Sequence, residues 1–453
     1  MITVSLSGLV GGRVGVSLAV LPATIARAHV AQLLADGARP SYLAPHAEWV
    51  DARDVPAQCA AEVVLTVDGP RGTAYAGARL RVHLSFPPAY PAHPPLVRFG
   101  SQLHHEQVLE GGLVGPPFYA ALGWERKPAR HVRTVMAEVH QLLVAPLPTG
   151  SRLSRATYLR IAQLQRLRTH TISAYAPLRT HGALFAQPPA LLAGWVEPRV
   201  LAACDARDDA AIRSCVHELA PGVFSLALFT PALCGLLLDE LRGFERTGLP
   251  ASRPNSMNRH GVIVDEIGME RLMDELRVRL VCPLAEALFT ESDQGGSHSL
   301  DHHHAFSVTY TPSADTGLDM HHDDSEVTLN VCLGSRFEGA GLTFCGRFGE
   351  TTYRKHIVTY AHQPGRAVLH LGRQRHGADT IVRGERSSLI VWARSSSYRA
   401  RAPDEPPMHQ RVAPDLCCLS YTHDIDYETW QELPPGVVGK RERLAKLRAM
   451  GGG

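Results

Sequence analysis

The sequence has 453 residues, of which 45% are apolar and 20% charged, and its formal net charge is +2. These values are ordinary for a soluble protein of two or three domains, and they give no charge-based case for binding nucleic acid or an anionic membrane. No apolar run approaches the length of a membrane span. Nine cysteines are too sparse for a disulfide scaffold, which predicts free thiols in a reducing compartment, the cytoplasm or nucleus.

The first 35 residues contain no acidic side chain but do carry Arg13 and Arg27, a composition weakly typical of an organelle transit peptide. An opening strand followed by a helix explains the same composition equally well. Both alternatives therefore stay open for residues 1–35.

Residues 23–148 predict a first domain of helix, strands and helix. Apolar and polar side chains alternate at 61–67 and 79–86, which is typical of strands, and residues 131–143 have helical spacing. The segment PPAYPAHPP, at 87–95, contains too many prolines for either regular element.

The remaining sequence predicts a linker, a second domain and a tail. Residues 149–222 read as a helical linker, which includes an amphipathic helix at 153–167. Residues 223–398 begin with two helical patterns, at 230–245 and 269–289. Short β-rich runs follow at 305–311, 326–333, 341–346, 366–372 and 387–394. This order favours a double-stranded β-helix, or jelly roll, buttressed by helices, so the whole chain is α+β. Residues 399–453 predict a loosely ordered tail with a helical end at 439–449.

The candidate chemistry lies in MHHDDSEVTLNV, at 320–331, and in RHGADTIVRGERSS, at 375–388. Two histidines and one carboxylate with open positions are typical of non-haem Fe(II) oxygenases. A His-x-Asp pair on an extended segment points both side chains to one side, and His376 can supply the distant third ligand. Spacing leaves two registers open, His321 with Asp323 or His322 with Asp324.

Arg386 follows His376 by ten residues, and Ser388 comes two positions later, on the same face of a predicted strand. A buried arginine needs an anionic partner, because an unpaired buried charge is costly. The distal carboxylate of 2-oxoglutarate is such a partner, since it can form paired, charge-assisted contacts with a guanidinium group.

These residues carry a family resemblance. Residues 305–344 resemble the catalytic core of procollagen lysyl hydroxylases, and together with 229–245, 253–268 and 373–394 they resemble more closely the group of 2-oxoglutarate and iron-dependent oxygenase domain-containing protein 2. The TLNV strand aligns the family's ligands with His321, Asp323 and His376, and its co-substrate arginine with Arg386. The resemblance implies Fe(2+) and 2-oxoglutarate, with L-ascorbate as an accessory reductant. Strand position would place Tyr310 and Asn330 near the site.

Other histidines and cysteines favour structural roles. The run His302–His304 precedes a strand, where a loop is expected, because three adjacent imidazoles cannot all face one ion. His356, His362 and His370 have no carboxylate at ligand spacing. Cys417 and Cys418 lack a second pair that would complete a zinc site.

The N-terminal segments 68–99 and 122–143 resemble ubiquitin-conjugating enzymes, through the YPxxPP bend and a tryptophan followed by a helix. The family's His-Pro-Asn is here His105-Glu106-Gln107, and the segment GGLVGPPF (111–118), expected to hold the active cysteine, has none. Cys59 lies elsewhere in the sequence. No thioester can form without a thiol, so the resemblance implies an inactive domain that either binds ubiquitin or a similar protein or only supports the second domain.

The sequence therefore predicts a dioxygenase that hydroxylates a C–H bond and converts 2-oxoglutarate to succinate. The lysyl-hydroxylase resemblance implies a protein side chain as substrate. Two alternatives stay open: a ubiquitin-pathway adaptor or scaffold with a non-catalytic oxygenase fold, and a zinc-dependent hydrolase. Intact ligands argue against the first, and Arg386 would have no obvious role in the second.

Overall fold

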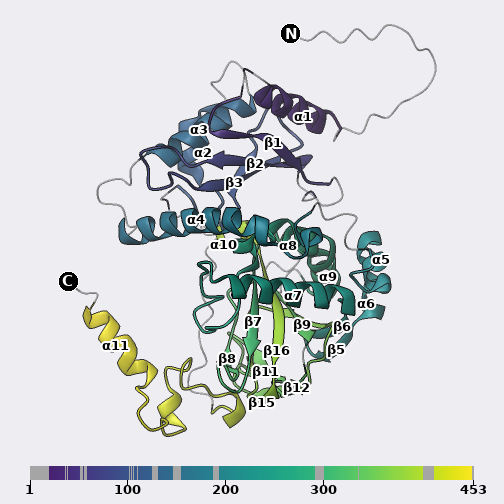
Figure 1. Cartoon of the computed structure of the whole chain (residues 1–453), viewed down its shortest axis with the longest axis vertical. Helices are drawn as coiled ribbons and strands as arrows, with labels where there is room; N and C mark the ends of the chain where they lie inside the picture. Colours follow the sequence, from purple (N-terminus) through teal and green to yellow (C-terminus); the bar gives the residue numbers. More distant parts are fainter. Residues whose placement is uncertain are drawn as a thin grey trace. The chain divides into compact units, whose positions relative to one another are not determined.

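The computed structural model describes residues 20–35, 37, 39–51, 55, 59–100, 103, 105, 107–109, 111–124, 131–145, 155–186, 193–290, 300–334, 336–400 and 413–450 (Figure 1). The chain divides into two compact units. The first comprises Met1–Val108 and Gly112–Leu159, and the second Leu109–Gly111 and Arg160–Gly453. Residues 1–19, which hold most of the transit-peptide alternative, lie outside the described residues. None of the helices in the described ranges combines the length and hydropathy needed to cross a membrane.

The described residues of the first unit form a four-stranded antiparallel sheet, three helices and the beginning of a fourth. Its strands are neighbours in chain order, namely β1 (Leu43–Trp49), β2 (Ala61–Asp68), β3 (Arg79–Phe86) and β4 (Leu96–Phe99). Its helices are α1 (Val20–Leu34), α2 (Pro116–Leu122) and α3 (Val132–Val144). The strands predicted at 61–67 and 79–86 and the helix predicted at 131–143 are confirmed. Along α3 the buried residues recur at helical spacing, which gives the helix one apolar face.

The proline-rich segment at 87–95 forms turns, as predicted. Tyr90 packs edge-on against Phe86 at the end of β3, with ring centroids 4.8 Å apart. The indole nitrogen of Trp124 donates to the carbonyl oxygen of Pro91 at 3.0 Å. Aromatic packing and a side-chain hydrogen bond therefore hold a bend that cannot pair as a strand.

The second unit contributes most of the helices. Among the described residues they are α4 (Arg155–Tyr175), which begins in the first unit, α5 (Pro198–Ala206), α6 (Asp209–Cys215), α7 (Pro231–Thr247), α8 (Glu270–Leu276), α9 (Cys282–Leu288), α10 (Ser396–Ala400) and, in the tail, α11 (Lys440–Met450). The helix predicted at 269–289 is interrupted between α8 and α9 by a π-helical turn, Arg277–Val281. Pro283 explains the interruption, because it has no backbone N–H to continue the α-helical hydrogen bonds.

Two antiparallel sheets hold the remaining core. The larger has the order β5-β6-β13-β9-β16-β7 and the smaller the order β12-β11-β14-β8. The strands are β5 (His217–Ala220), β6 (Val223–Ala227), β7 (His302–Tyr310), β8 (Leu318–His321), β9 (Val327–Gly334), β11 (Leu342–Arg347), β12 (His356–Tyr360), β13 (Arg366–Leu371), β14 (Gln374–Ala378) and β16 (Arg386–Arg394), with β10 (Phe337–Gly339) and β15 (Ile381–Gly384) forming a separate pair. From β7 to β16 the chain crosses repeatedly between the two main sheets, although β11 and β12 follow one another within the smaller sheet. The expected α+β organisation is confirmed.

The larger sheet has two different faces. Leu329 and Val331 of β9 lie in one apolar core with α7, α8 and α9, which run along one side of the strands (Figure 1). Thr328 and Asn330 instead face a cavity shared with the smaller sheet. Residues from the predicted linker are buried in the same apolar core, including Tyr175, Leu184, Val200 and Ile212. This segment therefore contributes to the second unit's core as well as connecting the units.

The histidine run does not form the predicted loop, because β7 begins at His302. His302, His303 and His304 pair with Arg394, Ala393 and Trp392 of β16. Pairing with the long strand β16 extends β7 toward its N-terminal end. The local sequence around His302 does not reveal this pairing.

The tail contains more structure than its composition predicts. Within residues 413–450 the chain forms 3-10 turns at Leu416–Cys418 and Tyr427–Thr429 and helix α11 (Lys440–Met450). Cys418 is buried and forms a disulfide with Cys345 of β11. The expectation of free thiols is therefore wrong for this pair, which is separated by 73 residues, too far apart for sequence spacing to reveal. The other described cysteines are free.

Candidate metal centre

Three buried side chains meet between the two sheets: His321 at the end of β8, Asp323 two residues later, and His376 within β14. Strands β8 and β14 are antiparallel neighbours, with His321 directly opposite His376. Opposed residues project to the same face, so the imidazole centroids lie 4.4 Å apart. One ligand atom from each of the three side chains lies within 4.8 Å of the others. The structure thus brings the predicted facial triad together.

Backbone carbonyl groups orient both imidazoles. His321 Nδ1 lies 2.7 Å from the carbonyl oxygen of Asp319, and His376 Nδ1 lies 2.9 Å from that of Gln374. Because a carbonyl oxygen can only accept, each Nδ1 donates and carries the proton. The two Nε2 atoms, 3.3 and 3.6 Å from the Asp323 carboxylate oxygens, therefore carry the lone pairs.

Asp323 is fixed from two sides. Its backbone N–H donates to the carbonyl oxygen of Gly372 at 2.9 Å, and the Thr328 hydroxyl donates to Oδ2 at 2.7 Å. Burial alone would raise the pKa of the Asp323 carboxyl, but the imidazoles of His376 and His321 lower it below its ordinary value. Burial lowers the pKa of His376 to about 3. A neutral imidazole beside an ionised carboxylate is the protonation state that metal ligation requires.

The alternative pair of candidate ligands, His322 and Asp324, points away from this centre. His322 is exposed and stacks on Phe348, with ring centroids 4.9 Å apart. Asp324 is also exposed and forms ion pairs with Arg394 at 2.8 Å and Arg399 at 2.7 Å. The two-residue period of the extended chain therefore separates the two registers that spacing left open.

Arg386 begins β16 and is 1% exposed. Its Nη1 donates to the carbonyl oxygen of Ala340 at 2.6 Å, and its Nη2 donates to His362 Nδ1 at 2.8 Å. Its Nε is buried without a hydrogen-bond partner. Among the described residues no carboxylate lies within ion-pair distance of this guanidinium group. Burial lowers the pKa of Arg386, as expected for a buried cation that lacks a close anion.

A single cavity joins Arg386 to the triad, and Tyr310, Asn330 and Ile390 also line it. Tyr310 lies opposite Arg386 in the register of β7 and β16. Ser388 shares the Arg386 face of β16 by strand alternation, and it is fully buried. Both the Ser388 hydroxyl oxygen and Asn330 Oδ1 are buried without a hydrogen-bond partner. Asn330 and Arg386 therefore bring unsatisfied polar atoms to the cavity, whereas Ser388 is not among the residues that line it.

Sequence spacing missed two histidines that the fold brings to this site. His370 of β13 lies 4.0 Å from Asp323 Oδ2 through its Nε2, and His362 contacts Arg386. His370 reaches the site within β13 and His362 from the loop between β12 and β13, so no local motif could reveal them. His356 is exposed and contacts Thr359 instead. Within the described ranges, no other group of three or more His, Cys, Asp and Glu side chains gathers at ligand distance.

In the first unit, the thiol of Cys59 is poorly suited to act as a nucleophile. Cys59 is half-buried, and burial together with the nearby Glu62 raises the pKa of its thiol to about 11. At neutral pH this thiol is protonated and a poor nucleophile. His105 Nδ1 accepts from the backbone N–H of Gln107 at 3.1 Å, and Glu106 lies outside the described residues.

Two family models match the chain. A ubiquitin-conjugating enzyme model matches residues 44–166, and an OGFOD2-like domain model matches residues 173–294. Human ubiquitin-conjugating enzyme E2 G1 aligns with 27% identity over 27% of this chain and 94% of that structure, with a TM-score of 0.22. The match to the family model confirms the expected ubiquitin-conjugating-enzyme-like domain.

Several relatives are similar to this chain over part of its length. The 2-oxoglutarate and iron-dependent oxygenase domain-containing protein ICU11 of Arabidopsis thaliana is 31% identical over 299 residues, which cover 61% of this chain and 73% of that protein. The human 2-oxoglutarate and iron-dependent oxygenase domain-containing protein 2 is 43% identical over 39% of this chain, although the match spans only 50% of the human protein. Mouse procollagen-lysine,2-oxoglutarate 5-dioxygenase 1 is 27% identical over 36% of this chain and 22% of its own length. The chain belongs to the family of 2-oxoglutarate and iron-dependent oxygenase domain-containing proteins.

Proposed function

We propose that the second unit is an Fe(II)- and 2-oxoglutarate-dependent dioxygenase that hydroxylates a C–H bond of a protein side chain. The observation that carries this proposal is one cavity that joins a His-Asp-His triad to a buried arginine without a nearby carboxylate. Neither feature alone distinguishes an oxygenase, because a triad also suits zinc and a buried arginine also suits a structural ion pair.

The donor set fits Fe(II). His321 and His376 each turn Nδ1 toward a backbone carbonyl group, which leaves Nε2 directed to the same side as an oxygen of Asp323. Three protein ligands on one face leave the remaining positions open, as in non-haem Fe(II) oxygenases. A zinc-dependent hydrolase is less well supported, because such an enzyme would give the buried Arg386 no role.

The other end of the cavity fits a dicarboxylate. Arg386, which lines the cavity, would bind the distal carboxylate of 2-oxoglutarate through its Nε and Nη groups. The Ser388 hydroxyl group, which is buried without a hydrogen-bond partner two residues along β16, would donate to the same carboxylate. When bound, Fe(II) and O2 supply the oxidising power that inserts one oxygen atom into the substrate C–H bond and the other into succinate, with release of CO2. The chain's own part is to hold the ligands, neutralise the co-substrate and exclude water.

An anaerobic titration tests this proposal directly. Adding 2-oxoglutarate to the Fe(II)-loaded protein should produce the visible charge-transfer band that arises when a 2-oxo acid chelates Fe(II). We expect Asp323→Ala to lose the band because it loses iron, and Arg386→Met to require far more 2-oxoglutarate. A wild-type protein that binds Fe(II) but shows no band at saturating 2-oxoglutarate would contradict the proposal.

The substrate class rests on the similarity to a procollagen-lysine dioxygenase, whose name specifies lysine in procollagen. Fold and family do not fix a substrate, so the proposal extends only to protein side chains as a class. We include L-ascorbate in the assay as an accessory reductant. Comparing hydroxylated proteins in cells with active enzyme and with Asp323→Ala would identify the substrate.

A second function is supported for the first unit. It matches a ubiquitin-conjugating enzyme model, but segment 111–118 contains no cysteine, so binding of ubiquitin or a similar protein without thioester transfer is the proposed role. An NMR titration of labelled ubiquitin with the full chain tests this role. Shift changes confined to one ubiquitin surface would support it, and unchanged spectra would favour a purely supporting domain.

A further inference from the structure

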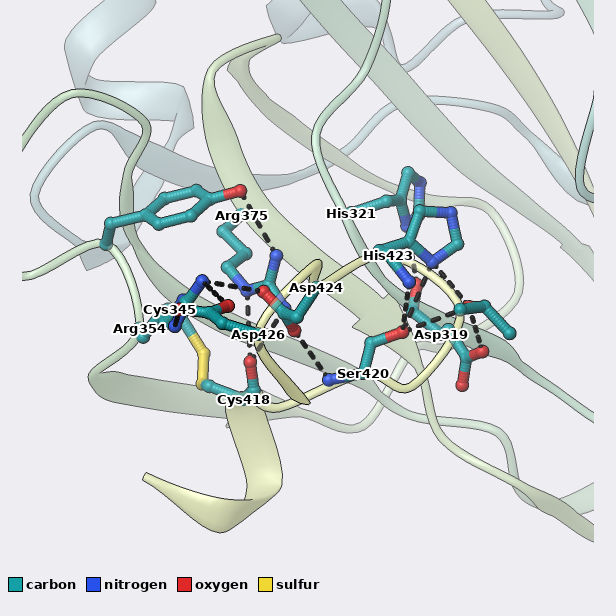
Figure 2. A network of polar contacts seen from close by, with 12 residues as sticks. Asp319, His321, Cys345, Arg354, Arg375, Cys418, Ser420, His423, Asp424 and Asp426 are labelled. Atoms are coloured by element: carbon teal, nitrogen blue, oxygen red, sulfur yellow. Dashed lines mark hydrogen bonds and ion pairs between the residues drawn. A yellow bond between two sulfur atoms is a disulfide. The ribbon is translucent and has the colours of Figure 1, made fainter. Parts of the chain in front are cut away.

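Residues 413–430, here named the C-terminal strap, lie against the strands that carry the two histidines of the candidate metal centre (Figure 2). Arg375 precedes His376 on β14, so the two side chains point to opposite faces of the strand. His376 faces the cavity, whereas Arg375 extends toward the strap, where it is 1% exposed.

The strap accepts hydrogen bonds from two of the three guanidinium nitrogens of Arg375, Nε and Nη2. Its Nη2 donates to Asp424 Oδ2 and to the carbonyl oxygen of Cys418, at 2.8 Å in each case. Its Nε donates to the same carbonyl oxygen at 3.0 Å. Tyr353, from the turn between β11 and β12, supplies its hydroxyl oxygen to Nη1 at 3.2 Å. A buried cation held in this way fixes the backbone on both sides of it, including the Gln374 carbonyl group that orients His376.

The strap also reaches the strand that carries the other histidine. The Thr422 hydroxyl donates to the Asp319 carboxylate, and the backbone carbonyl oxygen of Asp319 accepts from His321 Nδ1. The neighbouring strap residue His423 lies close to the same ligand, with its ring centroid 6.1 Å from that of His321. Strand β8 is an edge strand, so another strand holds it on one side alone.

The strap is itself anchored at separate points. Asp426 accepts from both Nη atoms of Arg354, at 2.6 and 3.0 Å, and Cys418 is joined to Cys345 by the disulfide. Within the strap, the backbone N–H of Ser420 donates to Asp424 Oδ2 at 2.7 Å. Figure 2 shows Asp424 contacting both Arg375 and Ser420, with Arg354, Asp426 and the disulfide nearby. Asp424 therefore presents a pre-arranged carboxylate to Arg375.

We propose that the C-terminal strap sets the metal affinity of the site by positioning both histidines, with Asp424 acting through Arg375 and Thr422 acting through Asp319. This inference rests on the proposed function, in which His321 and His376 bind Fe(II). Each imidazole is oriented by a carbonyl group two residues before it, and the strap holds the strand segment that contains each of those carbonyl groups. Changing outer partners of metal ligands typically costs about 10–100-fold in metal affinity.

Metal affinity measured on the full-length chain tests the inference. Titration calorimetry with Co(II), and separately with Mn(II), would be performed on wild type, Thr422→Val and Asp424→Asn. We expect dissociation constants about tenfold weaker in each variant, by loss of an outer partner. The rate constant for succinate release should return close to the wild-type value at saturating Fe(II), because the reacting groups are unchanged. Thr422→Val is the milder variant and keeps the test valid if Asp424→Asn does not fold.

Thr352→Val is the matched control. Thr352 also donates to a carboxylate, that of Glu350 at 3.2 Å, but it lies in the turn between β11 and β12 and touches neither histidine strand. Its metal affinity should equal that of wild type. Dissociation constants for Thr422→Val and for folded Asp424→Asn within twofold of wild type would overturn the strap proposal, as would equal weakening in Thr352→Val.

The outcomes separate the strap proposal from the proposed function. If wild type binds metal through the triad and releases no succinate, the proposed function fails while the strap proposal stands. If wild type shows no triad-dependent metal binding, both fail. If succinate is released and the strap variants bind metal like wild type, the strap proposal alone fails.

Discussion

The first unit keeps the sheet, the proline bend and the Trp124 contact of a conjugating domain, but segment 111–118 has no cysteine. The second unit brings its triad and Arg386 into one cavity, and several buried polar atoms there have no partner. Such atoms cost stability in the folded chain, whereas the packing of the first unit needs no reactive group. The comparison teaches that a fold can persist after its catalytic residue is lost. Buried polar atoms without hydrogen-bond partners instead indicate that a ligand binds there and supplies those partners.

The largest effect should follow from removing the cation at the far end of this site. Arg386→Met should raise the KM for 2-oxoglutarate by about 100-fold or more, because at least one charge-assisted contact is lost. Fe(II) affinity should change little. Arg383→Met is the matched control, since Arg383 lies on the adjacent β15 with its side chain 83% exposed and paired with Glu338. A KM for Arg386→Met that equals the control value would remove the proposed co-substrate role.

A smaller effect on the KM for 2-oxoglutarate is expected from changing His362, which accepts a hydrogen bond from Arg386. His362 Nε2 donates to the carbonyl oxygen of Arg366 at 3.0 Å, and its Nδ1 accepts from Arg386. His362→Leu should therefore raise the KM for 2-oxoglutarate by about tenfold, the value of one lost hydrogen bond to a charged group, with kcat nearly unchanged. His356→Leu, on the exposed edge of β12, provides the comparison. An effect on kcat alone would show that His362 acts in some other way.

A buried ion pair outside the cavity should give a pH-dependent effect on stability rather than on catalysis. His303 lies 3.2 Å from Asp265 and 3.3 Å from Asp274, and Arg277 also contacts Asp274. Burial opposes its protonation, but the two carboxylates raise the pKa of His303 to about 9. The resulting stability is therefore fully present below the ordinary histidine pKa and is lost as the pH rises through about 9.

Thermal unfolding at a series of pH values measures this contribution. Wild type should lose several degrees in Tm between pH 7 and pH 10, whereas His303→Gln should start lower and change less. Parallel Tm curves for the two proteins would contradict the assignment of the charge to His303.

The smallest effect is expected in the first unit. Cys59→Ser should leave succinate release unchanged, and neither the variant nor wild type should form a reducible adduct with ubiquitin and its activating enzyme, because the Cys59 thiol stays protonated. Electrophoresis without reductant checks this outcome. A wild-type adduct that Cys59→Ser abolishes would show that the first unit has kept its chemistry.

Local pattern predicted much of both folds. Alternation placed β2 and β3, and helical spacing placed α3 and α7, because these elements bury one regular face. The short strands β8 and β14 were not delimited, although motif spacing indicated that their histidines lie on extended chain. Resemblance to a family, rather than spacing, selected the register of His321 and Asp323.

Long-range contacts account for what was missed. His362, in the loop between β12 and β13, and His370, within β13, reach partners that are distant in sequence. The tail docks through Asp424 and Cys418, whose partners also lie far away along the chain. No periodicity within a tail rich in proline and charge indicates that two of its aspartates will be buried against arginines. Pairing with β16 likewise turned the expected loop at His302–His304 into strand.

The most direct test of the central claim is release of succinate from 2-oxoglutarate by purified full-length protein with Fe(II), O2 and L-ascorbate. We expect slow succinate release even without a protein substrate, and none above background from Asp323→Ala prepared in the same way. Equal release from wild type and Asp323→Ala, or no release from wild type shown to contain Fe(II), would contradict the assignment of an Fe(II)- and 2-oxoglutarate-dependent dioxygenase.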